Sequence, residues 1–263
     1  MFDLIRTRLA ALLLVAAASL GLAACDLAAA PAQEPTKRFV IQADLDEIAQ
    51  SAGDENSVDD LLAESMEVIR RRVGSNFHSI TYEGDGRIVL ETSGSVEGSA
   101  LAALIGPTGE LDFRMVDPDA LPMDVIEGIA PPGSEILPMA DDLHGGSMAV
   151  RRLGGISGGL VVSARPAIDE NSGQPVLHIS FDQRGQEQLA RLTTENVGRQ
   201  MAVVFDDEIL MAPIIHEPIL SGSLQVAGGF TEESANELAI ILASGMLPTP
   251  FTLVEETVIT PGD

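Results

Sequence analysis

The spacing of apolar residues between positions 38 and 73 constrains the fold of this chain more than any other feature. Residues 38–44 form a short β-prone run. From Val58 onward the apolar residues fall three and four positions apart, which places them on one face of a helix. Arg70–Arg72 lie near the end of this segment, where cations suit the helix dipole. We interpret these arginines as a solvated cationic helix end, and binding of an acidic partner is the alternative.

The residues that follow predict a hairpin, a second helix and another strand. Residues 78–82 and 87–92 are β-prone runs joined by the turn sequence E-G-D-G, which is typical of a hairpin. A short helix over 99–105 and a strand over 111–116 come next. The order β-α-β-β-α-β predicts an α+β fold that begins with a ferredoxin-like base, residues 39–117.

Residues 118–159 differ in composition from the segments on either side. They contain several prolines and the glycine pairs at 145–146, 154–155 and 158–159. Proline and glycine interrupt regular structure, so we expect an irregular, mobile connection with one or two short strands.

Residues 160–250 predict a second α+β unit, a head with a mixed or antiparallel sheet. A nearly all-apolar run at 201–205 indicates a buried strand. Pro213 and Pro218 limit residues 209–219 to a bent or edge strand. The remaining predicted elements are strands over 161–167, 176–181 and 223–226, helices over 183–197 and from the cap Thr231 to Gly245, and a last strand over 251–259 within the C-terminal segment 251–263.

The N-terminus has the pattern of an export signal. Two arginines, Arg6 and Arg8, precede the uncharged apolar run 10–22, which is too short to span a bilayer comfortably. The following Leu-Ala-Ala-Cys, ending at Cys25, resembles the lipobox of bacterial lipoprotein signals. The resemblance implies that residues 1–24 are removed and that Cys25 carries lipid. An ordinary signal peptide with an incidental cysteine is the alternative.

The same resemblance predicts where the protein resides. Cys25 is the only cysteine, so an internal disulfide is excluded. Residues 25–38 are predicted to be the acylated cysteine and a flexible Ala/Pro-rich tether. Asp26 resembles an inner-membrane retention signal, so we expect a periplasmic body in the cell envelope, anchored by lipid to the inner rather than the outer membrane.

The charge balance excludes one class of partner. The chain has 15 lysines and arginines against 40 acidic residues, and removal of residues 1–24 leaves 13 against 39, a net charge of −26. Such a surface repels nucleic acid, so no nucleic-acid partner is expected.

No set of residues has the spacing of a catalytic, metal or cofactor site. The histidines are far apart and lack zinc-ligand spacing: His78, His144, His178 and His216. The glycine-rich run 154–159 lacks the Lys-Ser/Thr of a phosphate loop, and no serine lies in a G-x-S-x-G elbow. We therefore expect a non-enzymatic protein without metal or cofactor. A hydrolase, the third hypothesis, needs a nucleophile and a base that this pattern does not offer.

Several motifs together resemble the SecD protein-export family. Leu192-Thr-Thr-Glu-Asn-Val-Gly-Arg199, Met201–Asp206, Ala212-Pro-Ile214 and Gly228-Gly-Phe-Thr231 are similar to the head of the first periplasmic domain of SecD. Glu67–Val73, Gly86–Val89 and Leu111–Asp117 resemble the base of that domain. The resemblance covers most of residues 39–258. It implies contact with exported, unfolded polypeptides or with components of the Sec translocon.

Two departures from the family pattern qualify this resemblance. SecD continues into a transmembrane bundle that conducts protons, and we expect this chain to be a stand-alone lipoprotein without that motor. Asp207 stands where the family usually has glycine. The leading hypothesis is therefore an accessory to protein export that binds polypeptide or translocon components. The alternative is a structural module that docks on another envelope complex.

One predicted surface is a candidate for polypeptide binding. Ile209, Met211, Ile214 and Ile215 lie on the proline-limited strand. If its edge is exposed, an extended peptide can pair with it by strand addition, which requires no particular sequence. The alternative is that these side chains belong to the core.

Overall fold

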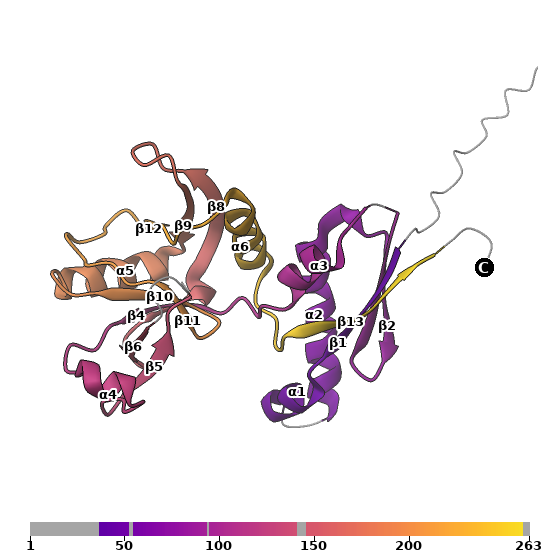
Figure 1. Ribbon diagram of the computed structural model, residues 1–263, viewed down its shortest axis with the longest axis horizontal. Helices are drawn as coiled ribbons and strands as arrows, with labels where there is room; N and C mark the ends of the chain where they lie inside the picture. The colour runs from indigo at the N-terminus through magenta and orange to yellow at the C-terminus, as the bar shows by residue number, and fades with distance from the viewer. Residues whose placement is uncertain (1–36, 53–54, 94, 141–145, 260–263) are drawn as a thin grey trace, which may run out of the picture. The chain divides into compact units, whose positions relative to one another are not determined.

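The computed structural model describes residues 37–259 except 53–54, 94 and 141–145 (Figure 1). The predicted signal, Cys25 and most of the tether lie outside the described residues. The first strand begins at Lys37, so the last two residues assigned to the tether belong to the folded body. Within the described part of the chain, no helix is long and apolar enough to cross a membrane.

A four-stranded antiparallel sheet with the order β13-β1-β3-β2 forms the base. Its strands are β1 (Lys37–Ala43), β2 (Ser79–Gly84), β3 (Arg87–Thr92) and β13 (Phe251–Val258). The yellow C-terminal strand β13 pairs with the indigo β1 in Figure 1. This is the ferredoxin-like order, so the predicted fold class is confirmed.

The predicted fourth strand of the base was wrong. Residues 111–116 do form a strand, β4 (Leu111–Met115), but it pairs with strands of the head. The base is completed instead by β13, and the head is inserted between the helix Gly98–Ile105 and β13. Periodicity predicts a strand locally, whereas its partner depends on contacts more than a hundred residues away in sequence.

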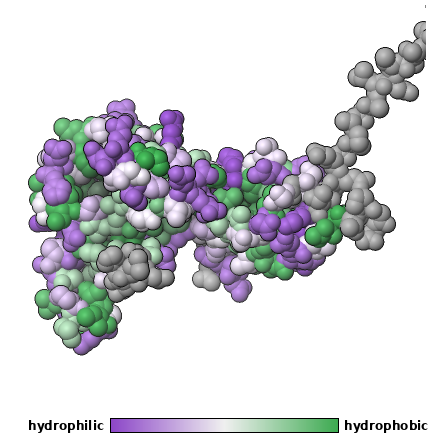
Figure 2. Space-filling view, turned by 45° about the horizontal axis from the view of Figure 1, so that its top comes forward, coloured by the Kyte–Doolittle hydropathy of each residue, from purple (hydrophilic) through white to green (hydrophobic). Residues whose placement is uncertain are grey.

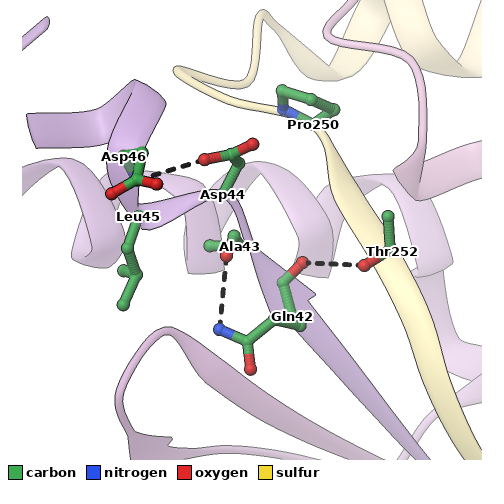
Figure 3. A pocket seen from close by; sticks show the side chains of 7 residues that line it. All are labelled: Gln42, Ala43, Asp44, Leu45, Asp46, Pro250 and Thr252. Atoms are coloured by element: carbon green, nitrogen blue, oxygen red, sulfur yellow. Dashed lines mark hydrogen bonds between the residues drawn. The ribbon is translucent and has the colours of Figure 1, made fainter. Parts of the chain in front are cut away.

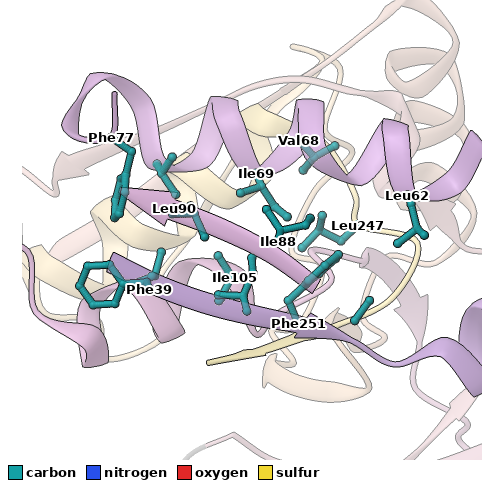
Figure 4. Close-up of a cluster of buried hydrophobic side chains, with 14 of the residues drawn as sticks. Phe39, Leu62, Val68, Ile69, Phe77, Ile88, Leu90, Ile105, Leu247 and Phe251 are labelled. Atoms are coloured by element: carbon teal, nitrogen blue, oxygen red, sulfur yellow. The ribbon is translucent and has the colours of Figure 1, made fainter. Parts of the chain in front are cut away.

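Helices α1 (Leu45–Ala52), α2 (Glu55–Val73) and α3 (Gly98–Ile105) and the short helix η1 (Gly74–Asn76) complete the base. Figure 4 shows side chains of α2 meeting those of the strands in one core. Phe39 and Phe77 pack edge to face there, with ring centroids 5.9 Å apart. The predicted helix from Val58, the hairpin and the helix over 99–105 are confirmed, and α1 was not predicted.

The head contains two larger sheets and a hairpin. One sheet has the order β11-β10-β4-β7 and the other β12-β9-β8. The helices are α5 (Gln183–Glu195) and α6 (Glu232–Ser244), and α6 is capped by Thr231 as predicted. Besides β4, the strands of these two sheets are β7 (Ile156–Ser157), β8 (Val161–Ile168), β9 (Pro175–Phe181), β10 (Met201–Phe205), β11 (Glu208–Met211) and β12 (Ser223–Val226). The short helix η2 spans Gly158–Leu160. Phe113 of β4 and Phe181 of β9 meet edge to face in the main core.

The expectation of an irregular connection over 118–159 was also wrong. It contains α4 (Pro122–Ile126), β5 (Ser134–Pro138), β6 (Ser147–Arg151) and β7, and β5 and β6 form an antiparallel hairpin. The glycines around β7 serve close packing: a Cβ on Gly155 would lie 2.5 Å from the carbonyl oxygen of Phe113. Glycine composition alone does not distinguish close backbone approach from flexibility.

Arg72 hydrogen-bonds to both segments that join the base to the head. Its side chain is 2% exposed and donates to the carbonyl oxygens of Pro107 at 2.5 Å, Thr108 at 2.7 Å and Gly245 at 3.1 Å. The interpretation of Arg70–Arg72 as a solvated helix end is therefore wrong for Arg72. Burial lowers the pKa of Arg72 to about 10, which leaves the guanidinium charged at neutral pH.

Candidate functional site

A cleft with a largely apolar lining lies beside helix α4 of the head. It lies between α4, strand β6 and residues 116–120, and its volume is about 740 Å³. We call it the α4 cleft. Its apolar lining consists of Val116, Ala120, Pro122, Val125, Ile126, Met148 and Ala149, with Pro118 and Gly146 beside them, and its polar lining consists of Asp117, Ser147 and Gln200.

Exposed apolar side chains lie on α4 and next to it in sequence, and one of them, Ile126, also lines the cleft. Four of them fall within nine residues, and we call them the apolar strip: Leu121 (61% exposed), Met123 (62%), Ile126 (77%) and Ile129 (55%). Figure 2 shows apolar surface at the end of the head where α4 lies. Scattered exposed apolar residues are normal, but a group of them gathered on one short segment beside a cleft is typical of a binding surface.

Local sequence explains why α4 forms at this place. Pro122 occupies the first turn, where its missing N–H costs nothing, and Leu121 before it is extended. Gly128, which follows the end of the helix, has a φ of +77°, a conformation that favours glycine. A helix of five residues is too short to be stable alone, so its position depends on packing against β6.

Asp117 fixes the chain at the edge of the cleft. Its carboxylate accepts hydrogen bonds from the Ser134 hydroxyl at 2.5 Å and from the Asp119 backbone N–H at 3.0 Å. The Arg151 guanidinium lies 3.9 Å away. The Ser134 bond, followed by that of Asp119, lowers the pKa of Asp117, so the group is ionised at neutral pH.

The four residues predicted for polypeptide binding do not form one exposed surface. Ile209 is fully buried and Ile215 is 5% exposed, so both belong to the core. Met211 is partly buried, and Ile214 is 49% exposed. The outer edge of β11 is also occupied at one point, because the Ala140 N–H donates to the Ile209 carbonyl at 3.0 Å.

The predicted bent strand is confirmed in outline. β11 ends at Met211, and pairing resumes where the Ile215 N–H donates to the Arg199 carbonyl at 2.8 Å. The apolar strip was not predicted from the sequence. A signal for it is present, because four large apolar residues fall within nine positions of a proline-rich stretch that has no lysine or arginine between Arg114 and Arg151.

A second hollow lies at the end of β1 and is lined by Gln42, Asp44, Thr252 and their neighbours (Figure 3). Its polar groups bond to nearby backbone. Asp44 accepts from the N–H groups of Asp46 and Glu47, both at 3.1 Å, and so caps α1. These hydrogen bonds give the polar residues of the hollow a structural role.

The described residues contain no group of three His, Cys, Asp or Glu side chains that could hold a metal ion. His144 lies outside the described residues.

Comparison with known proteins supports the assignment of the head. Residues 134–249 match the family model of the SecDF P1 head subdomain. The SecD translocase subunit of Acetobacter pasteurianus is 35% identical over 203 residues, which cover 76% of this chain and 38% of that protein. The subunit of Rickettsia prowazekii is 36% identical over 206 residues, covering 76% and 39%. The chain thus spans about two fifths of the length of these relatives.

A solved structure agrees with the fold as a whole. A SecDF structure described as a membrane component that enhances protein export superimposes with a TM-score of 0.61 at 26% identity. The match covers 84% of this chain and all of that one. The ferredoxin-like base with an inserted head is therefore a fold that this chain shares with that SecDF structure. The body of this chain is a first periplasmic domain of the SecD family.

Proposed function

We propose that this protein is a non-enzymatic accessory to protein export that binds exported, unfolded polypeptide in the α4 cleft. The observation that carries the proposal is the apolar strip, because its four exposed apolar side chains lie on or next to α4, and one of them, Ile126, lines a cleft of about 740 Å³. The relatives are named as protein translocase subunits. An unfolded polypeptide exposes apolar side chains, which an apolar surface can bind. We further propose that the head works on the periplasmic side of the membrane, near the Sec translocon.

In-cell photocrosslinking tests this function. A photoreactive residue replaces Met123 in the apolar strip, and a matched probe replaces Leu220, which is 73% exposed but lies outside the strip and the cleft. Capture of many different exported polypeptides from position 123, and few from position 220, supports the proposal. Equal capture at both positions contradicts it.

The rival function is a docking module for one folded envelope complex, which the same apolar strip favours. A single stoichiometric adduct from position 123 that persists when protein synthesis is blocked favours this rival. Exported polypeptides disappear under that treatment, so the two functions give different results.

The proposal includes a lipid anchor at Cys25, based on the lipobox-like sequence. Cys25→Ser removes the thiol that carries the lipid. We expect this variant to leave the membrane fraction, whereas an unchanged distribution contradicts anchoring at Cys25.

A further inference from the structure

Strand β6 turns main-chain groups toward the α4 cleft. The Met139 N–H donates to the Gly146 carbonyl at 2.9 Å, and the Arg152 N–H donates to the Gly133 carbonyl at 3.0 Å. Together with the register of the β5–β6 hairpin, these bonds show which residues of β6 direct their main-chain groups toward β5. Every second residue of β6 bonds to β5, and those between, Ser147 and Ala149, face the opposite edge. The cleft is lined by Ser147 at this edge.

The chain that pairs with this edge turns away before it reaches Ser147. Val116 bridges Val150, and the Asp117 N–H donates to the Ala149 carbonyl at 2.9 Å. The register would next place residue 119 opposite Ser147. However, the Asp119 N–H bonds to the Asp117 carboxylate instead, at 3.0 Å. The first residue of β6, Ser147, therefore lies in the cleft beyond the point where this partner turns away.

The charge around the cleft is negative. Between Arg114 and Arg151 the sequence contains seven acidic residues and no lysine or arginine. Asp119 and Glu127 are exposed and Asp124 is partly exposed beside the apolar strip. The Arg151 guanidinium lies 3.9 Å from the buried Asp117 carboxylate and offsets the charge of that group. The rim therefore favours a partner with positive charge outside an apolar stretch.

We propose that the α4 cleft binds an extended polypeptide segment as an added strand on β6. The segment pairs its main chain with Ser147, places alternate apolar side chains against the apolar strip, and carries lysine or arginine at its ends. Backbone pairing accepts many sequences, while the strip and the acidic rim select apolar segments with cationic flanks. This inference rests on the proposed function and specifies its binding mode and ligand chemistry.

Fluorescence anisotropy with the purified full chain and three labelled peptides tests the inference. The first peptide alternates valine with serine and has lysines at both ends. The second replaces the lysines with glutamates, and the third keeps the lysines but has N-methyl groups on alternate central amides. We expect the glutamate peptide to bind about fivefold more weakly, as loss of exposed charge pairs predicts. N-methylation should weaken binding about tenfold, because it removes main-chain hydrogen bonds.

Two variants locate the binding site. Ile126→Glu places a charge in the strip, and Leu220→Glu makes the same change at a similarly exposed position outside it. Both side chains are exposed, so neither change should unfold the protein. We expect Ile126→Glu to abolish binding of the lysine peptide and Leu220→Glu to leave it unchanged.

Each outcome distinguishes the inference from the function on which it rests. Equal binding of the N-methylated peptide overturns strand addition, while polypeptide binding stands. Equal or tighter binding of the glutamate peptide overturns the predicted cationic flanks. If none of the peptides binds, the proposed function fails with the inference. If sedimentation shows self-association that Ile126→Glu abolishes, a second copy occupies the cleft and the inference is wrong.

Discussion

At the scale of single residues, Arg72 supports more of the backbone than any neighbouring arginine. Its guanidinium donates to carbonyl oxygens on both connecting segments, and one further bond reaches Leu104 at 2.9 Å. A buried carbonyl oxygen without a hydrogen-bond donor lowers the stability of the fold. The planar guanidinium of Arg72 suits this position because it carries several N–H donors. Arg70 shares the helix but is half exposed and pairs with the exposed Glu67.

Replacement of Arg72 tests this role. Arg72→Met keeps much of the side-chain volume but removes every donor, and we expect the free energy of unfolding to fall by about 3–5 kcal/mol. Arg70→Met is the control and should change it by less than about 0.5 kcal/mol. Urea unfolding followed by circular dichroism measures both. Similar losses for the two variants would show that the carbonyls do not depend on Arg72.

Asp169 predicts a pH dependence of stability. Its carboxylate accepts bonds from Gln225 at 3.0 Å and from the Ser172 hydroxyl and N–H, both at 2.8 Å. These bonds, that of Gln225 first, lower its pKa from 3.8 to about 2. The depressed pKa means that the stabilisation is present above pH 3.8 and is lost as the pH falls toward 2.

The comparison variant is Asp169→Asn, which removes the ionisable group. We expect the difference in free energy of unfolding between the two proteins to be constant above about pH 5 and to vanish near pH 2. Chemical unfolding at a series of pH values measures it. A difference that stays constant down to the lowest pH contradicts the role of the charged carboxylate.

At the scale of elements, the turn between β10 and β11 depends on two residues with an unusual backbone conformation. Asp206 and Asp207, between β10 and β11, both have positive φ, at 46° and 63°. The Asp206 carboxylate accepts from the Thr108 hydroxyl at 2.6 Å and from the Glu110 N–H at 2.9 Å. An aspartate tolerates this conformation better than most residues, and here its side chain also holds the segment that enters the head.

Glycine substitutions near β7 distinguish close packing from flexibility. Gly155→Ala places a methyl group against the Phe113 carbonyl, and we expect a loss of about 1–3 kcal/mol in the free energy of unfolding. Gly159→Ala is the matched control, because its nearest neighbour, the Ser157 hydroxyl, would be at an ordinary 3.7 Å. Thermal unfolding of both variants measures the effect. If Gly155→Ala is as stable as Gly159→Ala, the close approach does not constrain the strand.

Elements with complete local signals could be predicted from the sequence. Strands 201–205 and 223–226 have the predicted bounds, and the helix capped by Thr231 begins where its capping residues place it. Pairing could not be predicted in the same way. Nothing in residues 251–258 indicates that they pair with β1 rather than with the head. The α4 cleft was missed because its residues come from separate stretches that only the fold brings together.

At the scale of the whole molecule, the base is built from two ends of the described chain with the head between them. The Leu247 N–H donates to the Thr108 carbonyl at 2.8 Å, so the two connecting segments are hydrogen-bonded neighbours. The base core includes Leu247 and Phe251 from the C-terminal segment. The head has separate clusters of buried residues around Phe113 and Val204. Each part thus has the apolar core that independent folding requires.

Excision of the head tests whether the base folds independently. Residues 109–246 are replaced by a short Gly/Ser linker, which the neighbouring positions of Thr108 and Leu247 permit. Tyr82 on β2 is the only tyrosine and the chain has no tryptophan, so tyrosine fluorescence reports on the base alone. We expect a cooperative urea transition in the excised protein. Truncation after Pro250, which removes β13 and the buried Phe251, should abolish that transition in the full-length background while circular dichroism still shows a folded head. A base that unfolds without the head would mean that Arg72 and its carbonyl partners are part of one cooperative unit.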